Sequence, residues 1–305
     1  KQTHKFTFDF SFCSINEADA SFSSQQLIYE KLARPLLERA FEGFNTCLFA
    51  YGQTGSGKSY TMMGFGEETG VIPRFCEELF SRLARSETKE KCCAIYLPFL
   101  LIYLLSFFFQ LRVREHPVYG PYVADLSTNV VSSYSDIKTW LELGNKQRAT
   151  AATGMNDKSS RSHSVFTLVM TQTKEEEHDH CITSRINLVD LAGSERCTSA
   201  QTSGDRLREG ASINKSLLTL GKVISSLSEQ SQSRKKVFTP YRESVLTWLL
   251  KESLGGNSKT AMIATLSPAA SNMEESLSTL RYAQQARMII NIAKVNEDTN
   301  AKLIR

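Results

Sequence analysis

The sequence lacks the cysteine pattern of a disulfide framework. Its seven cysteines are an odd number and form no CxxC pair, which favours a reduced, cytosolic protein. A signal-peptide pattern is missing from the charged start of the chain, and no repeat of about 20–50 residues is evident. A large excess of one charge is also missing, because the formal net charge is only +4. A uniformly basic nucleic-acid-binding protein is therefore not indicated.

Charged side chains are absent from one long run, residues 92–111. By length this run is a candidate membrane span, since about 20 apolar residues cross a bilayer. Pro98 would interrupt a helix there, and a span would separate polar segments that, as argued below, have to meet around one phosphate. We therefore expect no membrane span here, but a buried strand followed by an atypical segment.

The length and composition fit one large α/β domain. With 305 residues, 41% of them hydrophobic, the chain can bury a full core. Short apolar runs alternate with helical patterns, which is typical of a mostly parallel sheet. The pattern predicts strands over 6–10 and 165–170, and helices over 25–41 and 274–290.

A phosphate-binding loop is the strongest motif. Residues 52–59 fit G-x-x-x-x-G-K-[ST], between the β-prone run 46–51 and a segment that can open a helix. Glycines let backbone N–H groups turn toward the anion, Lys58 brings a charge to the β and γ phosphates, and Ser59 offers a hydroxyl to Mg²⁺. Alone, such a match could be a chance glycine-rich turn. The predicted nucleotide-binding residues are Gly52, Gln53, Thr54, Gly55, Ser56, Gly57, Lys58, Ser59 and Tyr60.

Two further polar segments fit a nucleotide hydrolase, which has to sense the γ-phosphate and orient a water. The run 185–190 reads as a strand that ends in Asp190, placed to hold the magnesium shell through water, and Gly193 lets a backbone N–H approach the γ-phosphate. Upstream, 156–163 combines hydroxyls, an arginine and a histidine, although an ordinary serine-rich turn is the alternative. The guanine-reading N-K-x-D pattern is not found, since 214–217 lacks the aspartate, so ATP is favoured.

Together these segments resemble the kinesin motor domain. The loop at 52–59, N-x-x-S-S-R-S-H at 156–163 and D-L-A-G-S-E at 190–195 look like its phosphate loop, first switch and second switch, in the family's order. The sequence of residues 241–250 is similar to that of the third class of kinesins. Within that class it looks closest to the mitotic member that works at the central spindle and midbody in cytokinesis. Myosin is a poorer match.

The resemblance implies a P-loop NTPase fold of the kinesin type, with a mostly parallel central sheet between two helical layers. It assigns residues 1–286 to the motor domain, and 287–305 to a neck-linker-like segment and the start of a following region. Two departures stand out: the family's opening R-x-R-P strand has no counterpart before Lys1, and 92–111 does not match the family's polar turn. We expect an N-terminally incomplete fragment of a longer protein.

Catalytic roles follow from the resemblance. Ser160 would complete the Mg²⁺ shell beside Ser59 and Asp190, and Ser159 would help to hold the attacking water. Arg161 and Glu195 would form a salt bridge while Glu195 relays a proton, although an exposed pair worth under about 1 kcal/mol is the alternative. The predicted catalytic residues are Ser159, Ser160, Arg161, Gly193 and Glu195. The residue after the loop's serine, Tyr60, would lie near the base.

Track binding is assigned to later segments. Apolar residues recur at helical spacing over 210–227, which resembles the relay helix whose other face lies on tubulin, and 288–296 resembles the neck linker. A basic loop would suit tubulin's acidic surface through screened attraction, although a solvated charge cluster is the alternative. The predicted microtubule-binding residues are Lys215, Lys222, Arg234, Lys235, Lys236, Tyr241 and Arg242.

The function predicted is a microtubule-stimulated ATPase that uses ATP and Mg²⁺ for plus-end-directed movement. We expect it in the cytoplasm on the cytoskeleton, at the spindle and midbody, with dimerisation through regions outside this chain. The departures keep a second hypothesis open. In that case the chain is a non-motile microtubule-binding module whose nucleotide site is incomplete or inactive.

Overall fold

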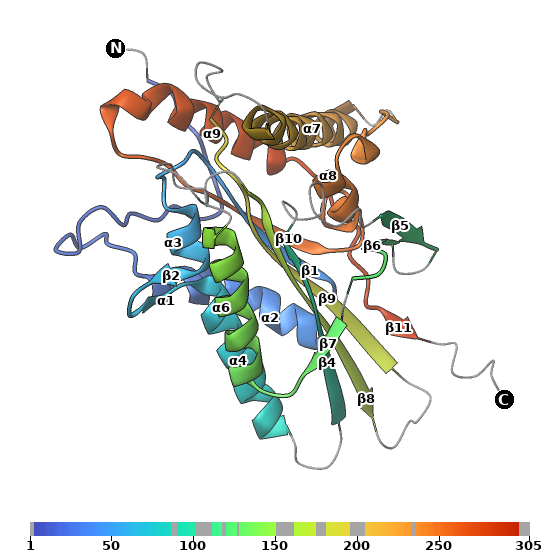
Figure 1. Ribbon diagram of the computed structural model, residues 1–305. Coiled ribbons are helices and arrows are strands. Elements are labelled where there is room, and N and C mark those ends of the chain that lie inside the picture. The colour runs from blue at the N-terminus through green and yellow to red at the C-terminus, as the bar shows by residue number, and fades with distance from the viewer. Residues whose placement is uncertain are drawn as a thin grey trace.

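A central sheet with helices on both faces organises the chain (Figure 1). The computed structural model describes residues 3–86, 91–101, 112–117, 120–126, 128–150, 162–174, 181–195, 205–233 and 236–298. Strands of the central sheet are β1 (Thr46–Tyr51), β4 (Lys91–Leu101), β7 (Thr128–Val131), β8 (Ser164–Lys174), β9 (Cys181–Asp190), β10 (Lys259–Ala264) and the short β11 (Glu297–Asp298). Two hairpins lie outside it, β2 (Gly64–Phe65) with β3 (Glu68–Thr69) and β5 (Val113–His116) with β6 (Gly120–Val123).

The sheet is mixed. Its order is β10-β1-β9-β8-β4-β7, with β11 paired to β9 outside this path. The pairs of β1 with β10 and β9 are parallel, whereas β8 is antiparallel to both β9 and β4, and β7 is antiparallel to β4. Strands β10, β1, β9 and β4 therefore point one way, and β8 and β7 the other. The parallel part, around β1, carries the phosphate-loop motif at its carboxyl end.

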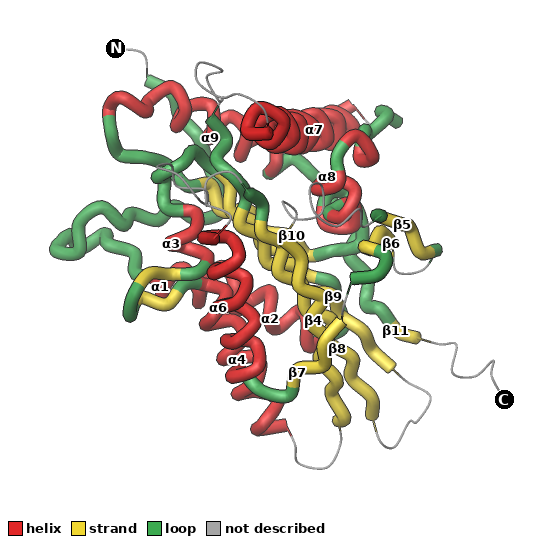
Figure 2. Tube along the Cα trace, viewed as in Figure 1, coloured by secondary structure: helices red, strands yellow, loops and turns green. Residues whose placement is uncertain are grey.

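Helices form two layers, and each has its own core (Figure 2). The alternation of β1 assigns Leu48 and Ala50 to one core and Cys47 and Phe49 to the other, as expected for a strand buried on both faces. The first layer contains α1 (Gln25–Ile28), a π-helical turn (Tyr29–Ala33), α2 (Arg34–Phe41), α4 (Val71–Ser86) and α6 (Tyr134–Thr150). The second contains α7 (Asp205–Ser233), α8 (Val245–Leu249) and α9 (Met273–Ala286). The short helix α3 (Lys58–Met62) begins at the phosphate loop, and 3₁₀ turns span Tyr241–Glu243, Lys251–Ser253 and Ala270–Asn272.

Most of the predicted elements are found. The helix over 25–41 is continuous as α1, the π-helical turn and α2, the strand over 165–170 lies within β8, and 92–101 lies within β4. The rest of the apolar run, 102–111, lies outside the described residues. Among the described residues, no helix combines the length and the apolar character of a membrane span.

One predicted strand is wrong, and one predicted helix ends earlier than expected. Residues 6–10 alternate like a strand but form none, because no strand among the described residues pairs with them, and Arg287 Nη1 instead donates to the Thr7 carbonyl at 2.9 Å. The last helix ends at Ala286 rather than 290, and the residues that follow run back along the domain. Apolar spacing alone does not mark either change.

Candidate functional site

The phosphate-loop motif has the predicted strand–loop–helix order. Strand β1 ends at Tyr51, and Gly52, Gly55 and Gly57 then take positive φ values of 154°, 77° and 97°. A Cβ on Gly52 would collide with the carbonyl oxygen of Thr265, whereas Gly55 and Gly57 face open space. The first glycine is therefore needed for close backbone packing, and the other two leave the concave side of the loop free of side chains.

Lys58 and Ser59 follow the loop at the start of α3. Lys58 is only 6% exposed, and its Nζ donates to the carbonyl of Gln53 at 2.7 Å, so the ammonium lies over the loop. The Ser59 hydroxyl donates to Asp190 Oδ2 at 2.6 Å. Register explains this contact, because Asp190 at the end of β9 pairs with Ala50 of the parallel strand β1. Two of the predicted magnesium ligands are thus adjacent.

The D-L-A-G-S-E segment packs directly on the phosphate loop. The Thr54 backbone N–H donates to Glu195 Oε2 at 2.7 Å, and the Thr54 hydroxyl donates to Glu195 Oε1. The Ser194 N–H donates to the Gly52 carbonyl at 3.0 Å. A Cβ on Gly193 would meet these Glu195 and Thr54 side-chain oxygens, so glycine leaves room for them at this position.

The first switch-like segment is described only at its end. Ser159, Ser160 and Arg161 lie outside the described residues, so the predicted pairing of Arg161 with Glu195 stays a prediction. His163 at the end of the motif is buried, and its Nδ1 accepts a hydrogen bond from the Ala192 N–H at 3.1 Å. The sequence motif contains this histidine, but nothing in the spacing of the motif indicates that the Ala192 N–H is its partner.

Tyr60, predicted to lie near the base, is at the exposed edge of the loop. Its hydroxyl donates to Glu68 Oε2 at 2.8 Å, and this hydrogen bond, followed by desolvation, raises the pKa of the phenol. From α1, Gln25 Nε2 donates to the Tyr60 carbonyl at 2.7 Å. Sequence reasoning did not identify Gln25 or Glu68, because neither lies in a motif.

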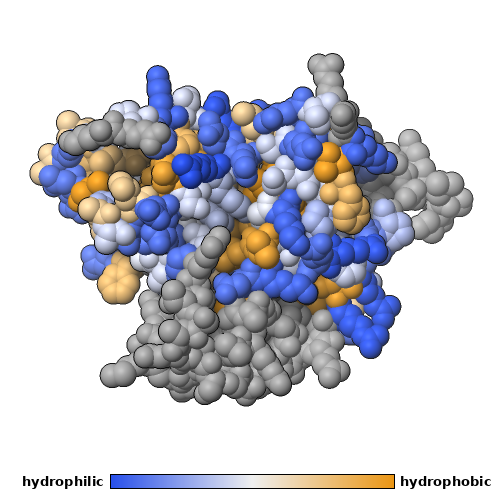
Figure 3. All heavy atoms as spheres, turned by 90° about the horizontal axis from the view of Figure 1, so that it is seen from above, coloured by the Kyte–Doolittle hydropathy of each residue, from blue (hydrophilic) through white to orange (hydrophobic). Residues whose placement is uncertain are grey.

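The predicted track-binding cations differ in their surroundings. Lys215 on α7 and Lys236 are exposed, and Arg234 and Lys235 lie outside the described residues. Lys222 and Arg242 are in ion pairs, the former with Glu243 at 2.7 Å. The face that carries α7 and α9, seen from above in Figure 3, is mainly hydrophilic with small apolar patches.

Glu115 on β5 pairs with two cations, Arg242 and Lys251. Its Oε2 accepts from Arg242 Nη2 at 2.6 Å, and its Oε1 accepts from Lys251. These hydrogen bonds, that of Lys251 first, lower the pKa of the Glu115 carboxyl. The Arg242 guanidinium also lies 5.1 Å from the centre of the Trp248 ring.

Tyr241 has a different environment from its neighbour Arg242. Its hydroxyl donates to the carbonyl of Leu254, and burial raises its pKa to about 12. The side chain therefore supports the turn that presents Arg242, and direct contact of Tyr241 with a track stays a prediction.

The segment after α9 lies against the edge of the domain. Asn291 Nδ2 donates to the Ser258 carbonyl at 2.8 Å, and its Oδ1 accepts from the Gly255 N–H at 2.8 Å. Further on, the Asn296 N–H donates to the Gly43 carbonyl at 3.0 Å, and β11 pairs with β9. The neck-linker-like segment is therefore docked along the sheet over these residues.

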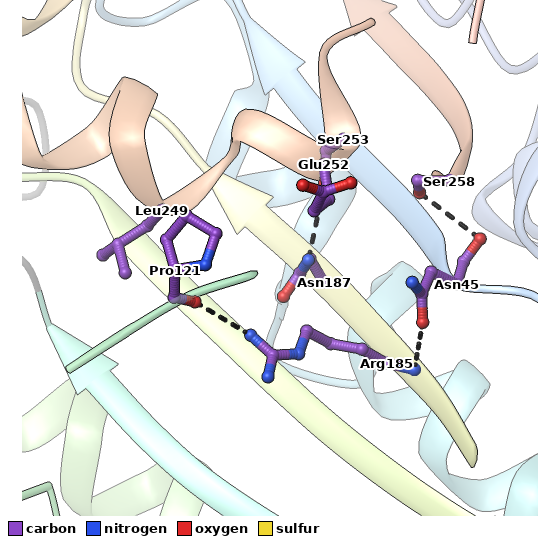
Figure 4. A pocket seen from close by; sticks show the side chains of 8 residues that line it. All are labelled: Asn45, Pro121, Arg185, Asn187, Leu249, Glu252, Ser253 and Ser258. Atoms are coloured by element: carbon purple, nitrogen blue, oxygen red, sulfur yellow. Dashed lines mark hydrogen bonds between the residues drawn. The ribbon is translucent and has the colours of Figure 1, made fainter. Parts of the chain in front are cut away.

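A small hollow near the docked segment is distinct from the phosphate loop (Figure 4). Arg185 Nη1 donates to the Pro121 carbonyl there at 3.2 Å, and burial lowers the pKa of the guanidinium while Glu252 opposes the shift. With a volume of about 20 Å³, it has room for water but not for a nucleotide. Its lining residues are Asn45, Pro121, Arg185, Asn187, Leu249, Glu252, Ser253 and Ser258.

Comparisons with known proteins agree on one family. A family model described as kinesin motor domain matches residues 1–289. The chain is 72% identical to the human kinesin-like protein KIF14 and 53% identical to the mouse kinesin-like protein KIF16B. Both matches cover 100% of this chain. It spans only 20% and 25% of the length of those two proteins.

Solved structures give the same result. A KIF14 dimer in the two-heads-bound state, with AMP-PNP and in complex with a microtubule, matches with a TM-score of 0.92 and 69% identity, over 100% of this chain and 88% of that one. KIF14 with ADP in complex with a microtubule matches with a TM-score of 0.82 and 69% identity, over 98% and 87%. The predicted family and kinesin-type fold are confirmed: the chain belongs to the kinesin motor domain family.

Proposed function

We propose that this chain is a microtubule-stimulated ATPase that converts ATP hydrolysis into plus-end-directed movement or force. One observation carries the proposal: Ser59 and Asp190 meet at 2.6 Å beside the phosphate loop, while Glu195 accepts the Thr54 N–H on the same loop. A phosphate loop, a magnesium pair and a γ-phosphate-sensing segment thus converge on one place. The family assignment and the microtubule complexes of KIF14 support the choice of track.

The residues present fit ATP with Mg²⁺. Mg²⁺ prefers hard oxygen ligands and is usually held by one or two protein groups together with water and substrate phosphates. The Ser59 hydroxyl and the Asp190 carboxylate are such a pair, and Ser160 would join them. The ion would neutralise charge on the phosphate oxygens, whereas Lys58 and the loop N–H groups bind and orient the phosphates.

Catalysis at this site is mainly positioning. Gly193 lies beside the loop, where Glu195 folds back over it onto Thr54, and its N–H would approach the γ-phosphate. When a γ-phosphate is bound, Glu195 leaves Thr54, pairs with Arg161 and relays a proton from the water that Ser159 helps to hold. Tyr60 lies beside the base.

Coupling to the track runs through α7 and the docked segment. Helix α7 follows the second switch-like segment in the chain and packs on α8 and α9, and α9 leads into residues 287–298. In this proposal the described residues Lys215, Lys222, Lys236, Tyr241 and Arg242 bind the acidic surface of tubulin. Arg234 and Lys235, which lie outside the described residues, are assigned to the same surface from the sequence alone.

The finer assignments belong to the same proposal. Residues 1–286 form the motor domain, and 287–305 form the neck-linker-like segment and the start of a following region. The whole protein acts in mitosis and cytokinesis on the cytoskeleton of the cytoplasm, at the spindle and midbody, and dimerises through regions outside this chain. The similarity to KIF14, of which a dimeric structure is known, supports the dimerisation.

ATP turnover with and without microtubules tests the proposal. The chain should hydrolyse ATP slowly alone and faster as the microtubule concentration rises. The Lys58→Ala variant should show neither basal nor stimulated hydrolysis. A chain that binds microtubules without any ATP turnover would instead be the non-motile module. Turnover that is equal with and without microtubules would contradict the proposed coupling.

A further inference from the structure

A buried chain of hydrogen bonds joins three segments that are far apart in the sequence. The Ala192 N–H donates to His163 Nδ1 at 3.1 Å, His163 Nε2 lies 2.6 Å from Ser216 Oγ, and the Ser216 hydroxyl donates to the Ile213 carbonyl at 2.7 Å. His163 is 3% exposed and Ser216 8% exposed. Water therefore does not readily replace either partner of the imidazole.

The partners fix the direction of every bond in this chain. A backbone N–H can only donate, so His163 Nδ1 carries no proton. A neutral imidazole then has its proton on Nε2, which donates to Ser216 Oγ. The Ser216 hydroxyl donates its own proton to the Ile213 carbonyl. The ring is thus held as the neutral Nε2–H tautomer, with a distinct contact on each side.

The two sides of the ring lead to different parts of the molecule. Ala192 is adjacent to Gly193 and lies two residues beyond Asp190, so the Nδ1 side touches the segment that packs on the phosphate loop. Ser216 lies on α7 beside the exposed Lys215, so the Nε2 side touches the helix assigned to the track. One rigid side chain therefore spans the distance between these elements.

We infer that His163 is a positioning residue that links movement of the Ala192–Gly193 backbone to α7. When a γ-phosphate draws the Gly193 N–H toward the loop, the Ala192 N–H moves with it, and the imidazole passes the displacement to Ser216. The inference rests on the proposed function in one respect, because it takes α7 as the track-binding helix. His163 touches neither phosphate nor track.

Ser216→Ala tests the link without weakening the helix, because alanine is the best helix former. The variant removes the acceptor of the Nε2–H and leaves the phosphate loop untouched. We expect ATP affinity to stay within about twofold of the parent, while microtubule stimulation of turnover falls by at least about fivefold, the lower end of typical coupling between sites. The matched control is Ser228→Ala, which removes another buried hydroxyl about three turns further along α7 and should keep full stimulation.

A double-mutant cycle separates a linking role from a stabilising one. His163→Asn and Ser216→Ala act on one chain of bonds, so the loss of stimulation in the double variant should equal that of the larger single variant. Additive losses would overturn the inference. So would variants that unfold at a lower temperature but keep the parent's stimulation, because the histidine would then serve stability alone.

Nitrogen-15 NMR of the imidazole gives a readout that does not depend on activity. The parent should show His163 as the neutral Nε2–H tautomer at pH 7, with its Nε2 signal shifted in Ser216→Ala and unchanged in Ser228→Ala. A neutral Nδ1–H tautomer or a charged ring would overturn the inference. If the parent shows this signature but no microtubule stimulation, the proposed function fails and the hydrogen-bonded link to α7 stands.

Discussion

Replacing Glu115 with glutamine removes the carboxylate that pairs with Arg242, a proposed track-binding residue, and with Lys251. Arg242 and Lys251 both pair with Glu115, and their side chains are 72% and 38% exposed, while that of Glu115 is 29% exposed. Any acidic surface that binds Arg242 has to compete with Glu115. We therefore expect Glu115→Gln to tighten microtubule binding.

The magnitude follows from the exposure of the pairs. Exposed ion pairs contribute about 0.2 to 1 kcal/mol each, because solvent screens them. Releasing two such pairs makes about 0.4 to 2 kcal/mol available to the complex, which corresponds to a roughly two- to thirtyfold gain in affinity.

The effect of Glu115→Gln should not change with pH near neutrality. The hydrogen bonds from Lys251 and Arg242 lower the pKa of Glu115 from its ordinary value of 4.5. A carboxyl whose folded pKa is lowered contributes its full stabilisation above the unfolded pKa and loses it as the pH falls through the folded pKa. The gain in affinity should therefore be equal at about pH 6.5 and 7.5.

Co-sedimentation with microtubules across a salt series measures this gain. Glu142→Gln is the control, because it removes the same charge from an exposed position on α6, in the other helical layer. The gain of Glu115→Gln over this control should shrink at high salt, as expected for screened charges. Equal affinity of the two variants, or weaker binding by Glu115→Gln than by the parent, would refute the reasoning.

Three further substitutions test the nucleotide site. Lys58→Ala should abolish ATP binding, because the loop loses its only cation, and unchanged affinity in a nucleotide titration would remove the phosphate-loop interpretation. Gly52→Ala should lower the unfolding temperature more than Gly66→Ala, since both have positive φ but only the Gly52 Cβ would meet backbone, and equal thermal shifts would argue against this packing. Glu195→Ala should bind ATP yet stall before phosphate release and accumulate on microtubules. Hydrolysis at the parent's microtubule-stimulated rate would show that Glu195 has no such role.

The nucleotide site could be predicted from sequence because its determinants are local. Strand, glycine loop and helix are consecutive from 46 to 62, and the carboxyl ends of neighbouring parallel strands meet at one edge of a sheet. Asp190 therefore had to lie near Ser59 once both strands were recognised. No comparable signal predicts the strand directions beyond β9, since the spacing of strands along the sequence does not reveal whether neighbouring strands are parallel or antiparallel.

The contacts that position the remaining side chains could not be predicted in this way. Arg242 and Glu115 are 127 residues apart, and His163 and Ser216 are 53 apart, so no local pattern relates them. The alternating residues 6–10 show the opposite case, in which a clear pattern forms no strand because no strand of the described residues pairs with it. Burial and hydrogen bonding with distant segments decide these features.

A gliding assay with polarity-marked microtubules tests the motor claim most directly. The chain would be attached to a surface through a C-terminal tag, with Lys58→Ala as the inactive control. The account predicts ATP-dependent gliding with the minus end leading, as a plus-end-directed motor requires. Microtubules that bind the surface but stay still in ATP, or that move with the plus end leading, would contradict it.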